Sequence, residues 1–169
     1  CLDAFKTGDV MFDAFVKFSN IKTNLENTLE DESYILATIH RKENISSRKT
    51  LSAILDSLER INRKKNIIMP LHPHTKKKIN EFNLSSKIKF IQPQSYLSLL
   101  NLLNNCSLVI TDSGGLQKES FYAKKKCLVI RDQTEWVELI ENRSNILCSP
   151  YSIYKKYNKI INEDVDFSK

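Results

Sequence analysis

The ten residues TDSGGLQKES, Thr111–Ser120, predict a turn from a buried strand into a helix. The apolar run Ser107–Ile110 before them is typical of a parallel strand covered on both faces. Gly114 and Gly115 are two of the three glycines in 169 residues, so we expect them to meet a backbone requirement. Because glycine lacks a Cβ, an anion can approach the N–H groups at the start of the helix, where the helix dipole is positive. The pattern favours a phosphate site, and a tight turn without a ligand is the alternative.

On either side of this turn, short apolar runs alternate with amphipathic segments. We expect about six strands, at Tyr34–Ile39, Asn66–Met69, Ile88–Ile91, Ser107–Thr111, Cys127–Ile130 and Asn145–Cys148. Helices are expected between and after them, at Leu51–Ile61, Thr75–Phe82, Tyr96–Leu103 (with Ser95 as N-cap), Thr134–Glu141 and Tyr151–Ile161. Such alternation predicts the α/β class, with a Rossmann-like, doubly wound parallel sheet.

The first part of the chain does not follow this alternation. Asp9–Phe18 predicts a helix, and Ile21–Asp31 predicts a linker or a second short helix. We therefore expect an N-terminal helical or linker segment over residues 1–30 and a nucleotide-binding domain over residues 31–169. The chain begins at Cys1 rather than Met, which indicates a piece of a longer protein, and its first residues do not resemble a signal peptide.

The composition is that of an ordinary globular domain. Apolar residues make up 41% and charged residues 27%, and no apolar run approaches the roughly 20 residues that a membrane span needs. No two cysteines form a CxxC motif, and Cys106, Cys127 and Cys148 lie in or beside apolar stretches. We therefore expect buried, reduced thiols, no membrane association and a cytoplasmic protein.

The chain has a net charge of +6, and its excess of basic residues is concentrated in three triplets of lysine and arginine, at residues 63–65, 76–78 and 124–126. Such triplets raise the possibility of a nucleic-acid or polyanion binding module. Aromatic residues do not interleave with them, and each falls at an expected helix end or exposed face. Solvated surface lysines are the favoured interpretation, so we expect no nucleic-acid partner.

Residues whose side chains can bind a ligand or take part in catalysis cluster in the loops that follow the expected strands. In a doubly wound sheet, ligands bind where loops leave the carboxyl ends of the strands. All three histidines lie in these loops. The loops also hold Arg41 and Glu43 beside His40, then His72 and His74, the Asp112–Glu119 segment, and Arg131 with Asp132.

Two other kinds of site fit these residues less well. Zinc would need the three histidines with Asp112, but His72 and His74 flank a proline and no HxxxH spacing exists, so we expect no metal. A serine nucleophile at Ser113 would need a GxSxG turn, which is absent because position 111 is Thr.

An anion site accounts for more of these residues. The Ser113 hydroxyl and the glycine amides can hold phosphate oxygens, and Arg41 and Arg131 can add charge-assisted bonds. Glu119 lies one helical turn further on, where its carboxylate can accept two ribose hydroxyls. A nucleoside diphosphate sugar would use all of these groups. For Arg131 the alternative is a surface ion pair with Asp132.

Five segments in this order resemble the non-hydrolysing UDP-N-acetylglucosamine 2-epimerases: TGDVMFDA (7–14), ATIHRKEN (37–44), PLHPHT (70–75), TDSGGLQKE (111–119) and RDQTEWVE (131–138). The resemblance covers roughly residues 7 to 148. It implies one half of a glycosyltransferase-B-like, two-domain fold, and it matches the C-terminal half. The N-terminal domain, absent here, would carry the acidic residues that handle protons at the sugar.

The resemblance also implies an activity. Such enzymes interconvert UDP-GlcNAc and UDP-ManNAc by eliminating UDP and adding it back with C2 inverted, without a cofactor. We expect a homodimer for the whole enzyme and no activity for this chain alone. A UDP-sugar-dependent glycosyltransferase donor-binding domain, which shares the fold, is the alternative.

The resemblance also implies roles for individual residues, according to their positions in the matching motifs. His40 matches a histidine near the diphosphate and sugar and is the expected catalytic residue. The expected substrate-binding residues are Arg41, Glu43, His72, Gln94, Ser113, Gly114, Gly115, Glu119 and Arg131. Among these, Ser113 and Gly115 match diphosphate binders, Glu119 the ribose binder, Gln94 a residue near uracil, and His72 a histidine near a regulatory UDP-sugar in some bacterial members.

Two positions depart from the pattern. Trp136 stands where many members have the arginine of TERPE, and Leu99 stands where some have an aromatic residue. These departures leave the identity of the acetamido-sugar open.

Overall fold

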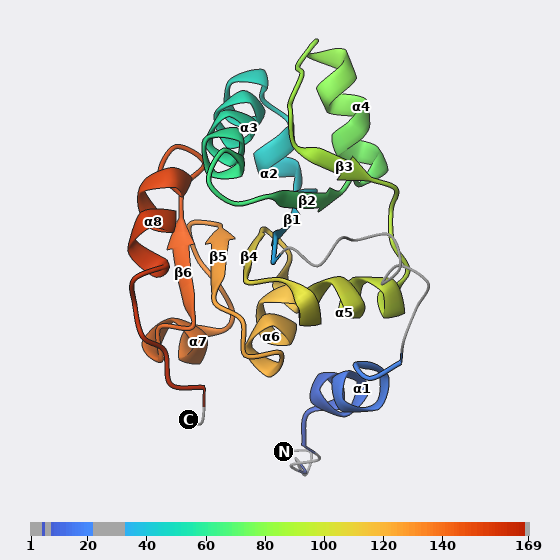
Figure 1. Cartoon of the computed structure of the whole chain (residues 1–169), viewed down its shortest axis with the longest axis vertical. Helices are drawn as coiled ribbons and strands as arrows, with labels where there is room; N and C mark the ends of the chain where they lie inside the picture. The colour runs from blue at the N-terminus through green and yellow to red at the C-terminus, as the bar shows by residue number, and fades with distance from the viewer. Residues whose placement is uncertain (1–4, 6–7, 22–32, 168–169) are drawn as a thin grey trace.

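The computed structural model describes residues 5, 8–21 and 33–167, and it contains a six-stranded parallel sheet flanked by helices (Figure 1). The strands are β1 (Ile35–Thr38), β2 (Ile67–Pro70), β3 (Lys89–Ile91), β4 (Leu108–Thr111), β5 (Cys127–Ile130) and β6 (Asn145–Cys148). The helices are α1 (Val10–Phe18), α2 (Lys42–Ile45), α3 (Arg48–Asn62), α4 (Pro73–Glu81), α5 (Tyr96–Asn105), α6 (Gly114–Tyr122), α7 (Val137–Glu141) and α8 (Ile153–Ile160). The predicted α/β class and doubly wound sheet are confirmed.

The strand order is β3-β2-β1-β4-β5-β6, and all neighbouring strands are parallel. From β1 the chain winds outward to β3, then returns to β4 and winds outward in the other direction to β6. The direction of winding therefore changes between β1 and β4. In an open α/β sheet, the carboxyl ends of two such strands border the ligand crevice.

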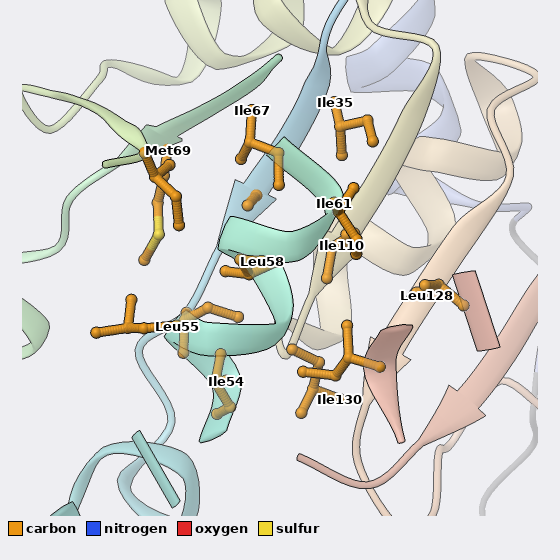
Figure 2. Close-up of a cluster of buried hydrophobic side chains, with 14 of the residues drawn as sticks. Ile35, Ile54, Leu55, Leu58, Ile61, Ile67, Met69, Ile110, Leu128 and Ile130 are labelled. Carbon is orange, nitrogen blue, oxygen red and sulfur yellow. The ribbon is translucent and has the colours of Figure 1, made fainter. Parts of the chain in front are cut away.

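Successive residues of each strand point to opposite faces of the sheet and into two separate cores. In β1, Ile35 and Ala37 join the core under α3, α4 and α8, whereas Leu36 joins the core under α1, α5 and α6. Figure 2 shows Ile54, Leu55, Leu58 and Ile61 of α3 packed against apolar residues of the strands. Since both faces are covered, β4 and β5 are buried along their whole length.

Helix starts follow the sequence signals closely. Ser47, Ser95 and Ser113 are N-caps whose side chains accept a bond from a backbone N–H in the first turn. Asp9 caps α1 in the same way, and its carboxylate also accepts from Lys118 Nζ and Tyr122 Oη. Helix α1 is thereby fastened to α6, and it also packs on α5.

Several boundaries differ from the predicted ones. Helix α4 begins at Pro73 rather than Thr75, because His72 Nδ1 accepts from His74 N and caps the helix. Helix α7 begins at Val137 rather than Thr134, because the Thr134 hydroxyl binds Gln117 and accepts from the backbone N–H of Trp136. Helix α2 was not predicted. The linker expected at residues 21–31 lies almost wholly outside the described residues.

The cysteines in the described part of the chain are free and buried, as predicted. Burial raises the pKa of the Cys106 and Cys148 thiols to about 12, so both are protonated at neutral pH. Among the helices of the described residues, none combines the length and the apolar character needed to cross a membrane.

We expect Leu58→Ala to lower the free energy of unfolding by about 3 kcal/mol, since Leu58 is fully buried between α3 and the sheet and truncation leaves a cavity. Urea denaturation followed by circular dichroism measures this loss. Ser57→Ala, one residue away, is the control and should change stability by less than about 0.5 kcal/mol. Equal losses in the two variants would contradict the packing described here.

Candidate functional site

A cavity of about 250 Å³ opens at the carboxyl edge of the sheet, where the winding reverses. The loops after β1, β2, β3 and β4 contribute to its wall. The wall residues are Thr38, Ile39, His40, Pro70, His72, Pro93, Gln94, Leu99, Ser113, Gly115, Leu116 and Glu119. Six of the residues predicted from sequence therefore share one cavity: His40, His72, Gln94, Ser113, Gly115 and Glu119.

The start of α6 forms one wall of this cavity. Ser113 N donates to Thr111 Oγ1 at 2.9 Å, and Ser113 Oγ accepts weakly from Leu116 N at 3.5 Å. A helix start leaves its first N–H groups without intrahelical acceptors. The amides of Gly114 and Gly115 are thus suited to receive an anion beside the Ser113 hydroxyl.

Asp112 organises the residues on the other side of the cavity. Its fully buried carboxylate accepts from His40 N at 3.1 Å, Arg41 N at 2.9 Å and Asn44 Nδ2 at 3.0 Å. Asn44 also donates to Ile130 O at 3.1 Å, so one side-chain network joins the ends of β1, β4 and β5. From the sequence, Asp112 was considered as a metal ligand, and this structural role was missed. The available signal was an acidic residue directly after a strand that is buried along its whole length.

The His40 imidazole is oriented by the same carboxylate. Its Nδ1 lies 3.2 Å from Asp112 Oδ1, which leaves Nε2 for a ligand. The His72 ring centroid lies 5.5 Å from that of His40. Burial lowers the pKa of His72, and the neighbouring His40 and His74 add to this effect. With Nδ1 accepting from His74 N, a neutral His72 carries its proton on Nε2.

Glu119 is a buried acid in the cavity wall. Burial raises its pKa, and a hydrogen bond from the Tyr96 hydroxyl offsets part of the rise. The pKa of Tyr96 rises in turn, to about 12, through burial and through the nearby Glu119. A carboxylate in this setting gains from hydroxyl donors, and the ribose of a nucleotide offers two.

Four of the predicted residues are not in the wall of this cavity: Arg41, Glu43, Gly114 and Arg131. Arg41, Glu43 and Arg131 line a neighbouring cavity of about 350 Å³, together with Asn44, Thr50, Ile130, Asp132, Gln133, Pro150 and Tyr151. Arg41 Nη1 contacts Glu43 Oε1 at 3.2 Å. Arg131 Nη1 contacts Glu135 Oε2 at 2.7 Å, so the ion pair considered for Arg131 involves Glu135 rather than Asp132. His40 lines the first cavity and the next residue in the chain, Arg41, lines the second.

Trp136 connects the loop after β5 to α6. Its Nε1 donates to Gly114 O at 3.0 Å, and Lys118 Nζ lies 4.2 Å from its ring centroid. A second tie is the bond of 2.7 Å from Thr134 Oγ1 to Gln117 Oε1. The tryptophan noted as a departure from the motif thus fixes this loop against the glycine turn.

Within the described residues, no group of three or more His, Cys, Asp or Glu side chains is arranged to hold a metal ion. The chemistry that the arrangement offers is anion binding by amides, a hydroxyl and guanidinium groups, with one oriented imidazole nearby.

Asp112→Asn should lower the free energy of unfolding by about 3 kcal/mol, because an amide NH₂ would face buried donors that a carboxylate now satisfies. Urea denaturation measures the loss. The matched control is Asp132→Asn, an exposed aspartate just after the neighbouring strand, for which we expect less than about 0.5 kcal/mol. A small effect at Asp112 would show that the network does not stabilise the fold.

Comparison with known proteins agrees with this geometry. The family model described as UDP-N-acetylglucosamine 2-epimerase matches residues 3–169. A UDP-2,3-diacetamido-2,3-dideoxy-D-glucuronate 2-epimerase from Pseudomonas aeruginosa is 40% identical over 141 residues, covering 83% of this chain and 40% of the relative. A UDP-N-acetylglucosamine 2-epimerase from Methanococcus maripaludis is 44% identical over 126 residues, covering 70% and 34%.

A solved structure shows the same likeness in three dimensions. The UDP-GlcNAc 2-epimerase from Methanocaldococcus jannaschii, in complex with UDP-GlcNAc and UDP, superposes with a TM-score of 0.86 at 34% identity. The match covers 95% of this chain and 48% of that chain, so our chain spans less than half of the length of these relatives. Fold, glycine turn and family model agree, and the chain belongs to the UDP-N-acetylglucosamine 2-epimerase family.

Proposed function

We propose that this chain is the UDP-binding half of an enzyme that interconverts UDP-GlcNAc and UDP-ManNAc. The observation that carries the proposal is the meeting of the glycine turn, His40 and Glu119 around one cavity at the sheet switch point. Family membership over residues 3–169 supports the same activity.

Each part of UDP has a chemically suited neighbour in this proposal. Uracil lies by Gln94 and Leu99, and the ribose hydroxyls donate to Glu119. The diphosphate takes bonds from the Ser113 hydroxyl and from the amides of Gly114 and Gly115.

The reaction begins with cleavage of the bond between the sugar C1 and the diphosphate oxygen. UDP leaves with the electron pair, a base removes the proton from C2, and 2-acetamidoglucal forms. UDP then adds back to C1 while C2 receives a proton on its other face. The α6 amides stabilise the negative charge on the departing diphosphate. His40 in its imidazolium form donates to the diphosphate from Nε2, while Asp112 accepts from Nδ1 and holds the ring.

The other groups have supporting roles. Arg41 and Arg131 add positive charge beside the diphosphate, and Glu43 orients Arg41. His72 borders the cavity beyond His40, where a second UDP-sugar would contact it.

The proton-transferring acids at C2 belong to a second, N-terminal Rossmann-like half in this proposal. Support comes from the coverage, since relatives are more than twice as long as the matched region. We further propose a cytoplasmic homodimer for the whole enzyme, consistent with the buried free thiols. The present chain is expected to bind UDP without catalysing epimerisation.

A second candidate substrate follows from one relative. The Pseudomonas aeruginosa protein acts, by its name, on a diacetamido-glucuronate sugar, and this chain is 40% identical to it. The same UDP elimination and re-addition would then occur on a sugar that carries a carboxylate. Assaying both UDP-sugars with the whole enzyme separates the two candidates.

Isothermal titration calorimetry tests UDP binding directly. We expect binding heat with UDP, and Ser113→Ala should weaken it about fivefold through loss of one hydroxyl bond. Ser57→Ala on α3, outside the cavity wall, is the control. A folded chain that gives no heat at about 1 mM UDP would contradict the proposal, and affinity for polyanions that falls steeply with salt would favour the nucleic-acid alternative.

Glu119→Gln should weaken UDP binding by about tenfold and yet raise the melting temperature at pH 7 by roughly 2–4 °C. The pKa of Glu119 is raised by burial, so its ionised form costs the folded state stability above that pKa. Below the ordinary value of 4.5, folded and unfolded chains are both protonated and the stability gain should vanish. Thermal unfolding at pH 7 and pH 4, with calorimetry at pH 7, measures both effects. A lower melting temperature at pH 7 would contradict this account.

A further inference from the structure

The Glu135 carboxylate already lies against the first residue of α6. A Cβ added to Gly114 would come within 2.5 Å of Glu135 Oε1 and within 3.8 Å of Arg131 Nη1. An ionised side chain of this protein therefore occupies space next to the glycine turn. The proposed diphosphate would bind at the same turn.

Arg131 holds Glu135 in this position. The ion pair is 2.7 Å long, and the Arg131 side chain is 13% exposed whereas that of Glu135 is 45% exposed. The Glu135 backbone N–H lowers the pKa of its carboxyl, and Arg131 and Arg41 lower it further. The Arg41–Glu43 pair lies in the adjoining cavity. The group beside Gly114 is thus an anion at neutral pH.

The backbone around Glu135 is fixed while its side chain has room to move. Trp136 Nε1 bonds Gly114 O, and Thr134 Oγ1 bonds Gln117, so the loop is tied to α6 on both sides of Glu135. Rotation of the half-exposed side chain moves the carboxylate away from Gly114 without displacing the loop.

We propose that Glu135 is an internal competitor of the diphosphate. In the free protein its carboxylate lies beside Gly114 and pairs with Arg131. On binding, the diphosphate displaces it and Arg131 turns to the phosphate. This inference rests on the proposed UDP-binding function. It makes Glu135 a residue that sets affinity.

Glu135→Gln tests the competition. The substitution keeps the shape of the side chain and removes its charge, so UDP should bind about two- to fivefold tighter, the factor equivalent to one exposed ion pair. Uridine, which has no phosphate, should bind the variant and the wild type equally. Nuclear magnetic resonance shift titrations with UDP and with uridine measure both affinities.

Glu138→Gln is the matched control, since it removes one exposed glutamate three residues further along the chain. UDP affinity should then equal that of the wild type. Equal tightening in both variants would reveal a general charge effect and overturn the competition.

The other outcomes are also decisive. Unchanged UDP affinity in Glu135→Gln overturns the proposal, and weaker binding shows that Glu135 positions Arg131 for the phosphate instead. In both cases wild-type binding of UDP leaves the proposed function intact. Failure of the wild type to bind UDP removes the proposed function and the competition together.

Discussion

Asp112 accepts hydrogen bonds from His40 N, Arg41 N and Asn44 Nδ2 while its own side chain is fully buried. An unpaired charge in that position would cost several kcal/mol, so the stability of the fold requires that the donors stay in place. This requirement fixes the start of α2 relative to β4. Through the bond from Asn44 to Ile130 O it also fixes the end of β5. The edge where the cavity opens is therefore held rigid by one carboxylate, which also orients the His40 ring.

The nine residues of helix α6 affect both the stability of the fold and the binding of a ligand. Its first turn offers amide groups, and its second turn carries Glu119, whose burial is unfavourable for the ionised form. Contacts from outside hold the helix in place: Asp9 bonds Lys118 and Tyr122, and Trp136 bonds Gly114 O. A buried acid that weakens the fold and serves a ligand is common at functional sites, where stability is exchanged for activity.

Much of the site was predictable, because parallel strands bring their carboxyl ends to one edge whatever the details of packing. His40, Ser113 and Glu119 share a cavity for this reason. The positions and partners of the guanidinium groups were less predictable, because a long arginine side chain can reach several carboxylates. Arg131 pairs with Glu135. Arg131 lines the neighbouring cavity and not the one that His40, Ser113 and Glu119 share. The structural roles of Asp112 and Trp136 were missed because both depend on groups distant in sequence.

The order of strands and helices, the serine caps and the glycine turn follow from local patterns, since periodicity and capping act over a few neighbouring residues. Alternation of strands and helices also implied the class of fold. The tertiary structure alone decided which charges meet. The ion pair between Asp9 and Lys118 and the close approach of the Glu135 carboxylate to Gly114 form only in the folded chain. Two charged groups interact strongly only when they lie within a few ångströms of each other. A folded chain can bring many different pairs of residues within that distance, so spacing in the sequence does not show which pairs form.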